Sequence, residues 1–166
     1  MKNMDETPLL MILQELAHLG RYEAARRLER FGLKPSQAGI LFVLNSQGSM
    51  SQRKLAEEIG ITPPSMTVAL RKLENQGLIQ KEPDACDQRV VKIKLSESGK
   101  VCIEKMKGMM DEMEYIFCRG LSQEEKLLLR RLFQEMKKNI MDSKEFRGMD
   151  MCSIMKKTRP PLKPEI

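Results

Sequence analysis

Residues 51–77 carry the pattern that most restricts the fold of this chain, two short helices joined by a tight turn. Ser51 is a suitable N-cap for the apolar-periodic segment SQRKLAEEIG, and Gly60 can adopt the left-handed conformation that ends a helix. Thr62 is then a second N-cap, and Pro63 stands at the first position of PPSMTVALRKLENQG. A short helix, a glycine-containing turn and a second helix are typical of a helix-turn-helix motif.

After residue 77 the apolar pattern changes from a helical period to alternation. The segments LIQKEP (78–83) and VVKIKL (90–95) both predict strands, and the polar segment DACDQR (84–89) between them predicts a turn. The sequence therefore predicts a two-stranded hairpin directly after the helix-turn-helix.

Amphipathic helices are predicted on both sides of this region. Towards the N-terminus, Thr7 and Pro8 suit the N-cap and first position of a helix whose apolar stripe continues to Phe31. A further helix is expected at about 35–47.

Two long helices are expected after the hairpin. Ser96 is a suitable cap for one that runs to about Arg119, and Ser122 with Glu125 forms a capping box for the next, which reaches about Ile140. Beyond residue 142 the periodicity fades, and the proline-rich, basic end of the chain is expected to be flexible.

Composition favours a binding protein over an enzyme. The net charge of +6 suggests a polyanionic partner only weakly, because the charges form no basic block. There is one histidine, and nucleotide-binding or nucleophile motifs are absent from the sequence, so we expect no catalytic site, metal site or cofactor. No apolar run reaches the roughly 18 residues of a spanning helix. With an acidic N-terminus and four cysteines outside any CxxC pair, we expect a cytoplasmic protein with free thiols.

Two segments together carry a family resemblance. They are RKLAEEIGITPPSMTVALRKLENQGLIQK and DACDQRVVKIKLSESGK, which contains the spacing Asp84-x-x-Asp87-x-Arg89. With the order of predicted elements over roughly residues 9–141, they resemble the MarR family of winged helix-turn-helix transcriptional regulators. The resemblance implies a homodimer that binds an operator in double-stranded DNA, most often as a repressor.

The resemblance also implies a division of the chain. The expected fold class is mainly α with a small β-hairpin wing, a winged helix-turn-helix joined to a helical dimerisation region. The expected parts are an N-terminal dimerisation helix (1–34), the DNA-binding region (35–95), C-terminal dimerisation helices (96–141) and a flexible basic tail (142–166).

Helical geometry divides the second helix of the motif into a buried and an outward face. The expected buried residues are Met66, Ala69, Leu70 and Leu73. On the outward face, Arg71 can donate two hydrogen bonds to guanine, and an exposed Val68 can contact a thymine methyl. Thr62 and the first amides of this helix are expected to favour a phosphate.

The wing is expected to add contacts of a second kind. By resemblance Arg89 enters the minor groove and Asp87 braces it, while Lys81 and Lys92 contact phosphates. The full set of predicted DNA-binding residues is Ser51, Gln52, Thr62, Pro64, Ser65, Thr67, Val68, Arg71, Lys72, Asn75, Lys81, Asp87, Arg89 and Lys92.

The terminal helices carry more apolar surface than a small winged domain can cover, which favours a dimer over an ordinary intrachain core. The predicted dimer-interface residues are Leu9, Ile12, Leu13, Leu16, Met113, Phe117, Leu128, Leu132, Met136 and Ile140. Because members of the family it resembles hold small aromatic anions, such an effector is a further expectation, with His18, Met106 and Met110 as pocket residues, although a plain helical core also explains the methionines.

An alternative function remains open at this point. The family often has an arginine where this chain has Val68 and Cys86, so two cations are missing from the expected DNA face. A winged-helix dimer that binds another protein without specific DNA binding is the second hypothesis.

Overall fold

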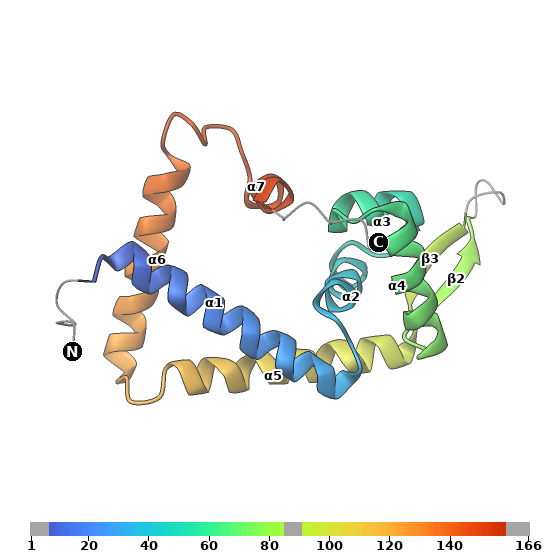
Figure 1. Ribbon diagram of the computed structural model, residues 1–166, viewed down its shortest axis with the longest axis horizontal. Coiled ribbons are helices and arrows are strands. Elements are labelled where there is room, and N and C mark those ends of the chain that lie inside the picture. Colours follow the sequence, from blue (N-terminus) through green and yellow to red (C-terminus); the bar gives the residue numbers. More distant parts are fainter. Residues whose placement is uncertain (1–6, 85–90, 159–166) are drawn as a thin grey trace.

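The computed structural model describes residues 7–84 and 91–158 (Figure 1). The elements are α1 (Leu9–Leu28), the 3-10 helix η2 (Glu29–Phe31), α2 (Pro35–Gln47), β1 (Met50–Ser51), α3 (Gln52–Ile59), α4 (Pro63–Asn75), β2 (Ile79–Pro83), β3 (Val91–Leu95), α5 (Glu97–Phe117), α6 (Gln123–Met141) and α7 (Met151–Thr158). The mainly helical fold with a small antiparallel sheet confirms the predicted winged-helix class. No helix in the described part of the chain is both long and apolar enough to cross a membrane.

The sheet has three strands in the order β1-β3-β2, whereas the sequence predicted two. The hairpin prediction missed β1, in which Met50 pairs with Ile93 and Ser51 with Lys92. A two-residue strand has too few residues to show an alternating pattern, so only the tertiary pairing defines it. This strand fixes the start of α3 directly against the wing.

One apolar core joins the helix-turn-helix to the sheet and to α5. Its fully buried side chains are Ile40, Leu41, Leu55, Met66, Leu70, Leu73, Ile93, Ile103 and Met106. They come from α2, α3, α4, β3 and α5, so the orientation of α4 is set by packing on several elements.

The first helix begins differently from the prediction. Pro8, not Thr7, is the N-cap of α1, and no side chain accepts a hydrogen bond there. The other predicted hydroxyl caps at Ser51, Thr62, Ser96 and Ser122 are confirmed by side-chain acceptance of a backbone N–H.

The helices α1 and α5 run side by side and are linked by ionic contacts (Figure 1). The buried Arg27 donates to Glu23 Oε1 at 2.7 Å and to Glu112 Oε2 of α5 at 2.6 Å. Hydrogen bonds from Arg26 and Arg27 lower the pKa of Glu23 from its ordinary value of 4.5 to about 2. The Glu23 carboxylate therefore favours the folded state as long as it is ionised.

We expect the substitution Glu23→Gln to destabilise the protein in a pH-dependent way. Because the folded-state pKa of Glu23 is depressed, its contribution is fully present above the unfolded pKa and is lost as pH falls from 4.5 towards 2. Urea unfolding should show the variant less stable than wild type at neutral pH, with the two converging near pH 2. A stability difference that is equally large at both ends of this range would contradict the assignment.

Two elements near the C-terminus contribute no buried side chain among the residues that the structure describes. Helix α6 leaves the far end of α5 and has no buried residue, although Leu128, Leu132 and Ile140 expose 49%, 42% and 55% of their surface (Figure 1). Helix α7 lies within residues 142–166, which we expected to be a flexible tail, and the sequence pattern did not predict a helix there.

Candidate nucleic-acid interface

Helix α4 separates an anchored side from an outward side, as predicted. Met66, Leu70 and Leu73 are at most 1% exposed, whereas Val68 on the opposite side is 58% exposed. The other outward residues, all exposed, are Pro64, Ser65, Thr67, Arg71, Lys72 and Asn75. The core therefore holds α4 so that a continuous row of its side chains meets solvent.

The first turn of α4 offers hydroxyl groups instead of backbone amides. Pro63 and Pro64 have no N–H, and the N–H of Ser65 is donated to Thr62 Oγ1 at 3.4 Å. These first positions of α4 therefore offer no free backbone N–H to a phosphate. The Thr62 hydroxyl donates to Ser65 Oγ at 3.0 Å, which leaves the Ser65 hydroxyl proton available for an outside acceptor.

Gln52 and Thr67, both predicted to contact DNA, bind each other. Gln52 Nε2 donates to Thr67 Oγ1 at 2.8 Å, and Thr67 Oγ1 donates in turn to the carbonyl of Pro63 at 3.0 Å. The Thr67 hydroxyl therefore uses its proton and one of its lone pairs for hydrogen bonds inside the motif. The pair braces α3 against α4, a role that sequence spacing could not reveal because the partners are 15 residues apart.

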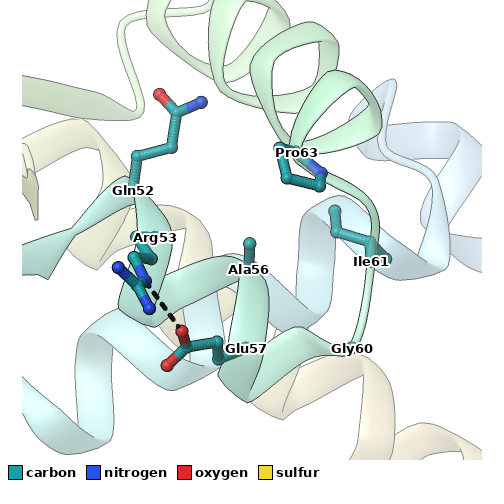
Figure 2. A pocket seen from close by; sticks show the side chains of 7 residues that line it. All are labelled: Gln52, Arg53, Ala56, Glu57, Gly60, Ile61 and Pro63. Atoms are coloured by element: carbon teal, nitrogen blue, oxygen red, sulfur yellow. Dashed lines mark hydrogen bonds and ion pairs between the residues drawn. The ribbon is translucent and has the colours of Figure 1, made fainter.

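A cavity of about 640 Å³ opens beside this brace (Figure 2). Its walls come from α3, the turn and the start of α4, with Ala56, Ile61 and Pro63 supplying apolar surface. Arg53 and Glu57 form an ion pair of 3.1 Å at its edge, and the Gln52 side chain extends towards α4. No single segment of the sequence marks this cavity, because its walls come from three neighbouring elements.

The wing lysines predicted to contact phosphate form ion pairs within the chain. Lys81 Nζ lies 2.6 Å from Glu74 Oε2, and Lys92 pairs with Asp84. By contrast, Arg71 and Lys72 on α4 have no ionic or hydrogen-bonding partner among the residues that the structure describes. The predicted wing-tip residues Cys86, Asp87 and Arg89 lie outside the described residues.

The predicted dimer residues are mostly exposed in the single chain, with one exception. The exposed set consists of Leu9, Ile12, Leu16, Phe117, Leu128, Leu132 and Ile140, and Leu13 and Met136 are partly exposed. Met113 is 6% exposed and belongs to the intrachain core, so its assignment to an interface is wrong.

The three residues of the predicted ligand pocket differ in burial. Met106 is fully buried in the core, whereas Met110 is 50% exposed and His18 lies on the surface against Arg21. A second cavity of about 620 Å³ lies elsewhere, between η2, the end of α4 and α5, and it includes Cys102. Burial raises the pKa of the Cys102 thiol. In the described part of the chain no cluster of three His, Cys, Asp or Glu side chains could hold a metal.

Comparison with known proteins agrees with this geometry. Residues 31–90, which include the helix-turn-helix and strand β2 of the wing, match the model of the MarR family. Over these residues the chain is similar to the MarR family. Members of this family are DNA-binding transcriptional regulators and not enzymes, and the resemblance noted in the sequence is confirmed.

Solved structures of MarR-family proteins superpose on most of the chain. MepR, a transcription regulator of the Staphylococcus aureus multidrug efflux pump MepA, is 27% identical with a TM-score of 0.73, and the match covers 81% of this chain and 99% of MepR. A mutant of S. aureus MepR bound to an oligodeoxyribonucleotide has the same identity and a TM-score of 0.66, and covers 81% and 99% of the two chains. E. coli MarR in its apo form, at 17% identity and a TM-score of 0.68 over 78% and 96% of the chains, shares the fold.

Proposed function

We propose that this chain is a homodimeric transcriptional repressor that binds a pseudo-palindromic operator in double-stranded DNA. The observation that carries the proposal is α4, whose buried side locks its orientation while Val68, Arg71 and Lys72 face solvent. A helix held in this way can enter the major groove and present its outward side chains to base edges.

The contacts divide by chemistry. The Arg71 guanidinium, which has no partner in the described chain, is suited to the two acceptors of guanine, and Val68 to a thymine methyl. Lys72, Asn75 and the Ser65 hydroxyl are suited to phosphate oxygens, which position the helix without reading sequence. Gln52 and Thr67 act by keeping α3 and α4 in register.

The wing supplies the remaining proposed DNA contacts. In keeping with the resemblance, Arg89 is proposed to enter the minor groove with Asp87 as its brace. Lys81 and Lys92 are proposed to meet phosphates, after exchanging their present carboxylate partners.

Dimerisation is proposed through α1 and α6. Leu9 and Leu16 on α1, with Leu128 and Leu132 on α6, leave an apolar surface uncovered in the single chain. A second copy is the natural cover for such a surface and would place two α4 helices about one turn of DNA apart. Release from DNA by a small aromatic ligand stays a separate prediction, because Met106 is buried in the core whereas His18 and Met110 are exposed.

We expect the double substitution of Leu128→Asp and Leu132→Asp to separate the dimer. Two buried carboxylates would oppose association of the subunits. Loss of the second subunit's DNA-binding region should lower operator affinity by about a hundredfold or more. Sedimentation equilibrium measures the mass, and fluorescence anisotropy measures the affinity. Gln134→Asp, on an exposed position of the same helix, is the matched control and should leave both unchanged.

Selection of bound duplexes from a random DNA library tests the function as a whole. We expect enrichment of two related half-sites about 10 base pairs apart, with affinity that falls steeply as salt rises. A dimer that enriches no sequence and ignores duplex DNA at low salt would overturn the proposal and favour the protein-interaction alternative.

A further inference from the structure

Positive charge is distributed unequally over the proposed DNA-binding surface. On α4, Arg71 and Lys72 have no ionic partner among the described residues. On the wing, Lys81, Lys92 and Lys94 are each paired with a carboxylate. The two cations of α4 are therefore available to DNA, whereas the charges of the wing lysines are already neutralised by carboxylates.

The register of the sheet explains the pairs on the wing. Glu82 is the direct partner of Lys92, and Gln80 is the direct partner of Lys94. These four side chains share the face opposite the buried Ile93, and the ion pairs Glu82–Lys94 and Asp84–Lys92 run diagonally across it. Acidic and basic groups thus alternate along this face, and their charges cancel.

A third pair joins the wing to the recognition helix. Lys81 extends from β2 to Glu74 near the end of α4, with 2.6 Å between Nζ and Oε2. Both side chains are about 40% exposed, at 39% and 41%. Solvated pairs of this kind are weak, so a phosphate can displace the carboxylate, but it must compete with it.

We propose that Glu74 and Glu82 attenuate DNA affinity by occupying Lys81 and Lys94, so that each lysine binds phosphate only after its carboxylate is displaced. This inference rests on the proposed DNA-binding function. The two acidic residues thereby limit sequence-independent binding to phosphates, and α4 determines the sequence specificity. Asp84 has the same relation to Lys92, but its side chain is only 12% exposed and is therefore less suitable for substitution.

The test measures binding of the full-length dimer to a mixed-sequence duplex of about 30 base pairs, long enough for two half-sites about 10 base pairs apart. We expect Glu82→Gln to raise affinity about 30-fold near 0.15 M salt, because one further phosphate contact in each subunit of the dimer steepens the salt dependence of log K by about 1.8 in total. Glu74→Gln is expected to act in the same direction through Lys81.

A double-mutant cycle separates this mechanism from a general change in charge. Lys94→Gln should lower affinity much more in the Glu82→Gln background than in wild type, because only there is Lys94 free to bind phosphate. Glu104→Gln is the matched control, since Glu104 forms a similar exposed pair with Lys107 on α5, away from the wing. It removes the same charge and should leave affinity unchanged.

The outcomes are distinct. Higher affinity for Glu82→Gln, no change for Glu104→Gln and a coupled effect of Lys94→Gln support the inference. Equal gains at Glu82 and Glu104, additive effects of Lys94→Gln, or no gain at Glu82 and Glu74 in a protein that binds DNA would overturn it. Failure of wild type and variants alike to bind any duplex would instead overturn the proposed function.

Discussion

The substitution Gly99→Ala is expected to prevent normal folding of the winged domain. A Cβ atom at Gly99 would lie 2.1 Å from the carbonyl oxygen of Leu78, a backbone atom that cannot move aside as a flexible side chain can. The same junction is tied by Ser96, whose N–H is donated to the Leu78 carbonyl and whose hydroxyl accepts the Gly99 N–H at 3.0 Å. We expect a loss of at least about 3 kcal/mol of the free energy of unfolding, the upper range for overpacking.

Gly108 provides the matched control on the same helix. No atom would lie within 4 Å of a Cβ at Gly108, and its backbone is helical. Gly108→Ala should therefore stabilise the protein by about 0.5–1 kcal/mol, because alanine is the better helix former. Urea unfolding followed by circular dichroism measures both variants. Equal and small effects at the two glycines would show that the tight junction between β2 and α5 does not exist in solution.

The substitution Arg71→Ala is expected to weaken operator binding and relax its sequence preference. If Arg71 donates two hydrogen bonds to one guanine, its loss should cost about 1–3 kcal/mol at each half-site, which is roughly 5- to 150-fold in the dissociation constant for each of the two contacts. The loss should be concentrated at one base pair of each half-site. The Arg71→Ala variant should therefore bind the unaltered operator and operators altered at that pair with similar affinities. Anisotropy titrations against a set of single-base operator variants measure this.

Two further variants distinguish base reading from simple charge. Arg71→Lys retains the positive charge but not the planar pair of donors, so it should lose specificity more than affinity. Lys107→Ala removes a cation from α5, where Lys107 pairs with Glu104 at 2.7 Å, and should change neither. A uniform loss across all operator variants with Arg71→Ala would place Arg71 on a phosphate instead of a base.

Local patterns were sufficient to predict most of the elements of this fold. The hydroxyl caps at Ser51, Thr62, Ser96 and Ser122 and the apolar period of α4 depend on residues within a few positions of each other. Such signals are readable because a helix satisfies its own backbone and shows its buried face as a repeat. The exposure of Val68 and the burial of Leu70 follow from the same repeat.

The errors arose where a partner comes from a distant part of the chain. Strand β1 exists through its pairing with β3, and Met113 is buried because the intrachain core, not a second copy, covers it. The partners of Lys81 and Lys94 are equally invisible in the sequence, since seven and twelve residues separate them from Glu74 and Glu82. These features depend on register and packing, which no local window contains.

The sequence by itself therefore determined the order of the elements, the caps that begin most helices and the side of α4 that faces solvent, because each depends on nearby residues. Only the tertiary structure decided which polar groups remain available. It pairs Gln52 with Thr67 and the wing lysines with carboxylates, and it leaves Arg71 without a partner among the described residues. The physical reason is that a side chain's charge is encoded by its residue type, whereas its partner depends on which elements the fold brings within a few ångströms.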